Sequence, residues 1–359
     1  MLRLAVVQLA PVHGDVQRNI ARANQLLENA GVGKNGHTVD AVFFPEMAFT
    51  GYVFDTPEDV VPLLEDVTTS SPLALETAPP KPADPEANKP GPTILFLSAL
   101  ARTLDAHVFA GAPIALHSTE TRADGILPGD AAYSHDIGSR DEDLYGRGRE
   151  RRELGANAAL VFRAGDGALA ACARKTNLFR SDVGWAKPGT SFTTFNLPKL
   201  GRTCVAICMD LNPFPAPDDD PEIFELADHC IATRARVLVL INAWLRSSSE
   251  ADGGDAGTEG EDWDTIRYWA HRLRPLYMGG SAADGEPSEV LVVVCNRVGS
   301  EGGLTFAGSS ALLRCVRGSG RAQLLDAMDG LEGVAVWDRA LRSIRALERN
   351  EVARLNDQK

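Results

Sequence analysis

Three side chains that could act together in nucleophilic catalysis stand at the ends of predicted strands: Glu46, Lys175 and Cys208. A free thiol with a pKa near 8.5 is only a few per cent thiolate at neutral pH, so a cysteine nucleophile needs a base or a cation beside it. Burial among apolar residues raises the pKa of a carboxylate, which suits it to accept and return a proton. The three residues would therefore provide a nucleophile, a base and a cation.

Each of the three also has a structural explanation when it is taken alone. Glu46 follows a proline and could cap a helix, Lys175 could be solvated, and Cys208 could be a small core residue. Their occurrence at three strand ends in one chain favours the catalytic interpretation. Cys204 precedes Cys208 by four residues and is predicted to share its face, because side chains alternate along a strand; core packing is the role expected for it.

Helices and strands alternate along the chain. Helical periodicity predicts helices between the N-cap Asp15 and the stop Gly31, and at about 93–105, 222–233 and 263–273. Short apolar runs predict strands at about 1–10, 41–44, 107–110, 158–162, 168–173, 203–207, 237–241 and 290–294, and a final strand pair at 309–315 and 333–336. Glycines at 165 and 167 predict a hairpin. The mixture favours an α/β fold with mixed sheets and outer helices over a purely parallel barrel.

The chain shows no internal repeat and no clear linker, so residues 1–359 are predicted to form a single domain. Three stretches are predicted as long loops, near 68–92, 120–153 and 247–262. The first is crowded with prolines, the second is rich in Asp, Gly and Arg, and the third consists mainly of Ser, Gly and acidic residues. Loops of this length are mobile or form part of a binding rim.

Composition excludes several classes of protein. The 36 Lys and Arg against 49 Asp and Glu give a formal net charge of −13, which disfavours binding to nucleic acid or to an anionic membrane surface. No apolar run approaches the roughly 20 residues that span a bilayer. The first residues are predicted to enter the fold as a strand and show no signal-peptide pattern. We therefore expect a cytoplasmic protein.

The six cysteines and seven histidines show no metal-ligand pattern. No two cysteines have CxxC spacing and no HExxH occurs, so neither a zinc site nor a disulfide framework is expected. We expect the chain to use no metal.

The sequence resembles the nitrilase superfamily of carbon–nitrogen hydrolases, in which a Glu-Lys-Cys triad stands in the contexts of Glu46, Lys175 and Cys208. The similarity runs along nearly the whole chain, from Leu4-Ala5-Val6-Val7-Gln8 to Asn296-Arg297-Val298-Gly299, Glu301 and Phe306-Ala307-Gly308-Ser309-Ser310. Within the superfamily, one branch looks most similar: the eukaryotic protein N-terminal asparagine and glutamine amidohydrolases. This second similarity rests on Cys208-Met209-Asp210-Leu211-Asn212-Pro213, Arg174-Lys175, Asp182, Trp185, Ala243-Trp244-Leu245, Tyr268-Trp269, Arg272-Leu273 and Pro275-Leu276.

The resemblance implies an α-β-β-α sandwich of two mixed sheets with outer helices, and a reaction that needs no cofactor. Glu46 would take the proton of Cys208, the thiolate would attack the amide carbon, and ammonia would leave a thioester for water to hydrolyse. Lys175 and the backbone N–H of Met209 would stabilise the oxyanion, where one donor can supply roughly 3–4 kcal/mol. The substrates would be the N-terminal Asn or Gln of proteins or peptides, and the product would feed an N-degron type of degradation.

Four further residues are tentative substrate-binding candidates: Asp210, Asp182, Trp185 and Trp244. Asp210 has two interpretations, as a partner for the substrate's α-ammonium or as a structural residue. Many relatives carry a second glutamate eight residues after the lysine, where this chain has Val183. Asp182 could replace it. Many relatives also have Gly-x-Pro-Glu after the strand at 107–110, whereas this chain has Gly111-Ala112-Pro113-Ile114.

Other functions remain open on sequence alone. A small-molecule amidase, ω-amidase or carbamoylase of the same superfamily would use the same three residues. The intact triad disfavours a catalytically silent binding protein. Nothing besides the shared triad supports a true nitrilase that acts on nitriles. Asn and Gln differ by one methylene, worth only about 1–3 kcal/mol of discrimination, so accepting both is easy. The sequence is compatible with a homo-oligomer and does not give the oligomeric state.

Overall fold

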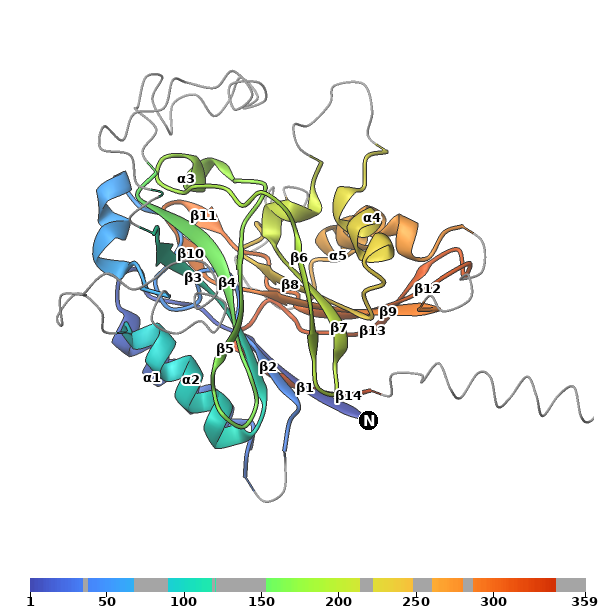
Figure 1. Ribbon diagram of the computed structural model, residues 1–359, viewed down its shortest axis with the longest axis horizontal. Coiled ribbons are helices and arrows are strands. Elements are labelled where there is room, and N and C mark those ends of the chain that lie inside the picture. The colour runs from blue at the N-terminus through green and yellow to red at the C-terminus, as the bar shows by residue number, and fades with distance from the viewer. Residues whose placement is uncertain are drawn as a thin grey trace, which may run out of the picture.

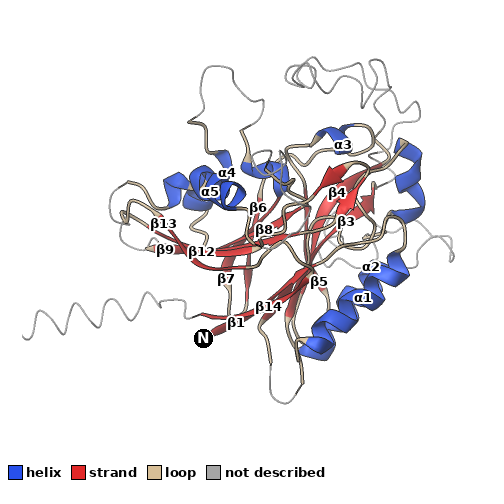
Figure 2. Ribbon diagram, turned by 180° about the vertical axis from the view of Figure 1, so that it is seen from behind, coloured by secondary structure: helices blue, strands red, loops and turns tan. Residues whose placement is uncertain are grey.

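Two six-stranded sheets form the centre of the molecule, with helices on their outer faces (Figures 1 and 2). The computed structural model describes residues 1–34, 38–67, 90–117, 120, 153–213, 222–247, 260–279 and 287–339. The predicted α/β fold with two mixed sheets and outer helices is confirmed. The three predicted long loops lie mostly outside the described residues.

The first sheet has the strand order β14-β1-β2-β3-β4-β5. Its strands are β1 (Leu2–Gln8), β2 (Ala41–Phe43), β3 (His107–Ala115), β4 (Gly155–Phe162), β5 (Leu169–Arg174) and β14 (Gly333–Arg339). Strands β1, β2 and β3 pair in parallel, and the pairs β14–β1, β3–β4 and β4–β5 are antiparallel. The hairpin predicted between β4 and β5 is confirmed, with Gly165 and Gly167 at φ values of +83° and +64°.

The second sheet has the order β13-β12-β9-β8-β7-β6. Its strands are β6 (Thr193–Leu197), β7 (Gly201–Ile207), β8 (Val237–Asn242), β9 (Glu289–Asn296), β12 (Ala311–Val316) and β13 (Ala322–Ala327). The central strands β7, β8 and β9 are parallel, and every residue of β8 is buried, as expected for a parallel strand covered on both faces. A short pair, β10 (Ser300–Glu301) and β11 (Leu304–Thr305), lies apart from both sheets.

The two sheets pack face to face. One buried cluster joins side chains of both, among them Val6, Phe43 and Phe109 of the first sheet with Val239 and Val293 of the second. This inner cluster also contains Cys208. The interior between the sheets therefore reaches the residue predicted as the nucleophile.

Helices cover the outer faces of the sheets. The helices are α1 (Val16–Asn29), α2 (Pro92–Leu104), α3 (Arg180–Val183), α4 (Glu225–Ala232) and α5 (Trp263–Arg272), with short 3-10 helices η1 (Pro57–Leu63), η4 (Cys208–Leu211) and η6 (Arg274–Leu276). Helices α1 and α2 pack on the first sheet, and α4 and α5 pack on the second (Figure 2). Among the described residues, no helix has both the length and the apolar composition of a membrane span.

The four predicted helices are confirmed, and α1 begins at the predicted cap: an oxygen of Asp15 accepts the N–H of Arg18 at 3.1 Å. The predicted final strand pair is wrong. Its two segments are strands, but β12 pairs with β9 and β13 while β14 pairs with β1 in the other sheet. The sequence also gives no sign of strands β6 and β13; their side chains are mostly half-buried or exposed, so they lack a clear apolar pattern.

Candidate functional site

The three residues predicted to act together meet in the structure, although they follow strands of different sheets. Glu46 comes after β2, Lys175 after β5 and Cys208 after β7. The Nζ atom of Lys175 lies 2.7 Å from Oε1 of Glu46. Glu46 and Lys175 are completely buried, and Cys208 is 7% exposed. The ends of three strands thus bring a carboxylate, an ammonium and a thiol close enough to interact electrostatically.

A tight backbone contact fixes Glu46. The N–H of Gly111 donates to the carbonyl of Pro45 at 3.0 Å, and the N–H of Ala48 donates to the carbonyl of Gly111 at 3.0 Å. A Cβ on residue 111 would lie 2.5 Å from Cα of Glu46, a distance that real Cβ atoms do not show. Only glycine therefore lets β3 come close enough to hold the turn at Glu46.

The backbone turns sharply at Cys208, which has a φ of +43°. Such a conformation is unfavourable for a residue with a Cβ and is common at functional sites. It breaks the strand's alternation, so the prediction that Cys204 shares a face with Cys208 is wrong. Cys204 belongs to the cluster beneath α4 and α5, whereas Cys208 lies in the inner cluster. The N–H of Cys208 donates to Oδ1 of Asn242 at 3.1 Å, which holds the turn.

Both oxygens of Glu46 accept hydrogen bonds. Oε1 accepts from Lys175 and from Nδ2 of Asn157, each at 2.7 Å, and Oε2 accepts from the N–H of Ala243 at 2.9 Å. Burial raises the pKa of Glu46 and the charge of Asp182 raises it further, while Lys175 lowers it. The net effect is a pKa above the ordinary value, as a group that exchanges a proton requires.

Lys175 contacts a second carboxylate. Its Nζ lies 2.6 Å from Oδ2 of Asp182, and it donates to the hydroxyl of Tyr52 at 3.2 Å. Burial alone would lower the pKa of Lys175, but the charges of Asp182 and Glu46 raise it well above its ordinary value. The lysine is therefore a permanent cation at neutral pH.

Asp182 lies beside the position where many relatives have their second glutamate, and it reaches the site. Nδ2 of Asn157 donates to its Oδ1 at 3.1 Å, and the N–H of Phe179 donates to its Oδ2 at 3.0 Å. Asn157 thus bridges the two carboxylates, Glu46 and Asp182, that flank Lys175.

Asp210 connects the segment after Lys175 to the strand before Cys208. Its Oδ1 accepts the N–H groups of Thr176 and Asn177, each at 2.8 Å, and its Oδ2 accepts the N–H of Ile207 at 2.9 Å. Burial raises the pKa of Asp210 to about 7, although the backbone donors lower it in part. These contacts are those expected from the structural interpretation of Asp210.

The remaining candidates lie around the site in different ways. Trp185 is buried and packs edge-on against Phe54, with ring centroids 6.1 Å apart. Trp244 is half-buried and packs against the inner cluster that contains Cys208. Met209 follows Cys208 in the first turn of η4, where N–H groups have no partner within the helix and can face a ligand.

Sequence reasoning missed several residues of this site. Tyr52 and the backbone N–H of Ala243 had no recognisable signal, because their partners are distant in sequence. Asn157 did have one, since it is a polar residue in a strand that is otherwise apolar and fully buried. A buried polar side chain needs a hydrogen-bond partner, and here its partners are the two carboxylates.

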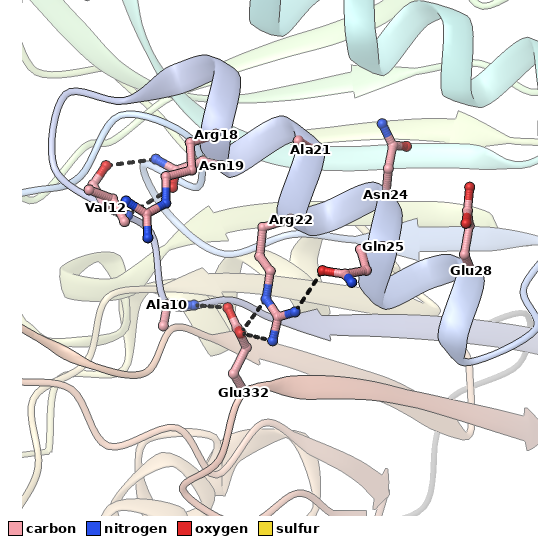
Figure 3. Close-up of a pocket in the computed structure, with 10 residues that line it drawn as sticks. All are labelled: Ala10, Val12, Arg18, Asn19, Ala21, Arg22, Asn24, Gln25, Glu28 and Glu332. Carbon is pink, nitrogen blue, oxygen red and sulfur yellow. Dashed lines mark hydrogen bonds and ion pairs between the residues drawn. The ribbon is translucent and has the colours of Figure 1, made fainter.

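A surface hollow along α1 is separate from this site (Figure 3). It is lined mainly by the outer face of α1 and by Glu332, and none of the three triad candidates lines it. Its polar groups bind one another: Glu332 accepts from Arg22 and from the N–H of Ala10 (Figure 3). Within the ranges described, no group of three or more metal-ligating side chains is found.

A thiol that interacts electrostatically with a buried carboxylate and a lysine ammonium has the groups needed to attack a carbonyl carbon and to stabilise the resulting charge. Residues 3–133 match the family model described as carbon-nitrogen hydrolase. This match agrees with the resemblance to the carbon–nitrogen hydrolases seen in the sequence, and the two-sheet fold is similar to that of a solved structure from the nitrilase superfamily.

Protein N-terminal amidases recur among the relatives. The chain is 27% identical to the protein N-terminal amidase of Schizosaccharomyces pombe over 328 residues, covering 88% of this chain and 92% of the relative. It is 23% identical to the Saccharomyces cerevisiae protein of the same name over 271 residues, covering 70% and 46%. A crystal structure of an N-terminal amidase with an Asn-Glu-Ala peptide superimposes with a TM-score of 0.67 at 16% identity, covering 95% of this chain and 99% of that one.

Proposed function

We propose that this protein removes the side-chain amide of an N-terminal Asn or Gln from proteins or peptides, releasing ammonia and leaving Asp or Glu. Cys208 is the nucleophile, Glu46 the general base and acid, and Lys175 the cation. The observation that carries the proposal is the buried contact of Lys175 with Glu46 at 2.7 Å, beside the strained turn at Cys208. The choice of substrate is supported by the relatives, which are named protein N-terminal amidases.

The resting thiol is protonated. Burial raises the pKa of Cys208 well above its ordinary value, and the charge of Glu46 raises it further, while Lys175 lowers it. The thiolate therefore forms only as the thiol proton passes to Glu46 and the sulfur attacks the amide carbon. Negative charge moves onto the amide oxygen, where Lys175 and the N–H of Met209 stabilise it.

Collapse of this intermediate breaks the carbon–nitrogen bond. Glu46 returns its proton to the nitrogen, ammonia leaves, and an acyl thioester remains on Cys208. Glu46 then takes a proton from water, and the resulting hydroxide attacks the thioester. The products are the carboxylic acid and the free thiol, so the cycle needs no external oxidant, reductant or cofactor.

Recognition of a chain terminus requires a site that favours the α-ammonium group. The buried carboxylates of Glu46 and Asp182 outnumber the ammonium of Lys175 that both contact, and the nearby guanidinium of Arg297 is itself paired with Glu301, so this group of charges is net negative and attracts a cation. Asp210 acts here as a positioning residue, because three backbone N–H groups occupy its oxygens. Deamidated N-termini would feed an N-degron pathway in the cytoplasm.

Trapping of the acyl intermediate tests this proposal. The protein is mixed with an Asn-initiated peptide and the reaction is quenched with acid. The fragment of the digested protein that contains Cys208 should then be heavier by the mass of the substrate peptide less ammonia. Cys208→Ala should abolish both the adduct and ammonia release. Cys204→Ala is the matched control, since Cys204 lies on β7, the strand that Cys208 follows, but belongs to the cluster beneath α4 and α5, and it should retain both. Turnover by Cys208→Ala near the wild-type rate would refute the assignment.

A further inference from the structure

Segments next to the proposed catalytic residues converge on Asn212. Nδ2 of Asn177, two residues after Lys175, donates to the carbonyl of Asn212 at 2.9 Å. Asn212 itself ends the turn η4 that begins at Cys208. From the outside, the hydroxyl of Tyr268 on α5 donates to Oδ1 of Asn212 at 2.7 Å. Tyr268 is thus held directly beside the turn of the nucleophile.

Trp244 is fixed in the same region. The preceding residue, Ala243, donates its N–H to Glu46, and the N–H of Trp244 donates to Oδ1 of Asn296 at 2.8 Å. The carbonyl of Trp244 accepts the N–H of Ala307 at 2.9 Å. Its ring packs against the inner cluster that contains Cys208. The backbone of Trp244 therefore has little freedom to move away from the site.

Trp244 and Tyr268 form one aromatic surface, which we name the aromatic platform. Their ring centroids are 5.5 Å apart, and Trp269 supports Trp244 from behind at 6.1 Å in an edge-on contact. Tyr268 is 40% exposed, although its hydroxyl reaches the residue that ends the turn of Cys208. The hydroxyl of Tyr268 donates to Asn212, and the exposed part of its ring is available to a ligand.

We propose that the aromatic platform binds the side chain of the second residue of the peptide substrate and prefers an apolar or aromatic one. This inference rests on the proposed function and deepens it. When the amide of the first residue is held at Cys208, the peptide must continue outward, and the exposed ring of Tyr268 is anchored on Asn212 at the end of the turn that begins at Cys208. Aromatic faces pack favourably on apolar and aromatic side chains, whereas a glycine at position two has nothing to place there.

The test compares ammonia release from two peptides that differ only at the second residue, Asn-Phe-Ala-Ala and Asn-Gly-Ala-Ala. Wild-type protein should have a kcat/KM about fivefold or more higher for the phenylalanine peptide. Tyr268→Ala should reduce this ratio to below about twofold. Tyr268→Phe, which keeps the ring but loses the bond to Asn212, should retain most of the preference.

Trp263→Ala is the matched control, because Trp263 is also an exposed aromatic residue of α5 but lies five residues away, on another face of the helix. It should leave the ratio unchanged. An unchanged preference in Tyr268→Ala, or equal rates for the two peptides in wild type, would overturn the platform while leaving the proposed function intact. Failure of both peptides to release ammonia from wild-type protein would overturn the proposed function and the platform with it.

Discussion

Replacing Asp182 by asparagine should move the acidic limb of the pH–activity profile to lower pH. Asp182 and Glu46 both contact the same Nζ atom of Lys175, at 2.6 Å and 2.7 Å. The negative charge of Asp182 is one cause of the raised pKa of Glu46. The substituted amide would keep the shape and remove the charge, so Glu46 would lose its proton at lower pH. Because the proposed mechanism needs Glu46 ionised in the free enzyme, kcat/KM of the variant should keep its maximal value down to a lower pH than that of wild type.

The size of the effect follows from the geometry. Since both carboxylate oxygens touch one nitrogen atom, they lie within about 5 Å of each other. Two like charges at that separation repel by about 3 kcal/mol at an effective dielectric constant of about 20. That repulsion is large enough for its removal to be measured. The maximal kcat should meanwhile fall by about tenfold to a hundredfold, because Lys175 loses a charged partner that holds it in position.

The assay is kcat/KM for ammonia release from an Asn-initiated peptide between about pH 4 and pH 9, for wild type and Asp182→Asn. Asp166→Asn is the control: Asp166 forms an exposed ion pair with Arg163, and its loss should leave the profile unchanged. An acidic limb that stays in place, or moves to higher pH, in Asp182→Asn would show that the charge of Asp182 does not act on Glu46.

Three further predictions concern the same site. Glu46→Gln and Lys175→Ala should each lower kcat by orders of magnitude. The double variant should lose far less than the product of the two losses, because both residues serve one transition state. A loss equal to that product would show that the two residues act independently. Gly111→Ala should lower the free energy of unfolding by about 1–3 kcal/mol or more and should reduce kcat, because the new Cβ would lie 2.5 Å from Cα of Glu46. A thermal unfolding curve and a kcat equal to those of wild type would contradict this close contact. For Asp210, the folded pKa of about 7 exceeds the ordinary value of 3.8, so its protonated form stabilises the fold at low pH and this contribution is lost as pH rises through about 7. The stability of wild type relative to Asp210→Asn should therefore increase from about pH 8 to about pH 5, by up to about 3 kcal/mol, and a decrease in denaturant unfolding would contradict this.

The sequence predicts those parts of the fold that depend on local pattern. Strands buried on both faces, such as β8, are continuous apolar runs, and amphipathic helices such as α1 show their period and their cap. The edge strands β6 and β13 are half exposed, and no such pattern identifies them. Which strands pair is a long-range property, and for this reason the local pattern pairs β14 wrongly with β12.

The residues of the site likewise divide into those that the sequence identifies and those that it does not. Glu46, Lys175 and Cys208 can be found from sequence because each residue type is distinctive at a strand end. The side of the sheet on which the Cys208 side chain lies cannot be predicted from the sequence, because its positive φ breaks the alternation expected along a strand. The partners of Glu46 are distant from it in the sequence: Asn157 comes from β4 of the same sheet, and the N–H of Ala243 comes from the end of β8 in the other sheet, so long-range pairing and packing fix these contacts.

The central claim is that Cys208 deamidates the first residue of a chain and no other, and acetylation of the substrate tests it most directly. Two peptides that begin with Asn, one with a free α-amine and one acetylated, should be compared by ammonia release and by conversion of Asn to Asp. We predict stoichiometric conversion of the free peptide and a loss of most of kcat/KM on acetylation, corresponding to roughly 2–5 kcal/mol if a buried charge is left without its partner. Equal hydrolysis of both peptides would contradict the claim and indicate a general amidase, and activity on free asparagine or ω-amides alone would indicate a small-molecule enzyme.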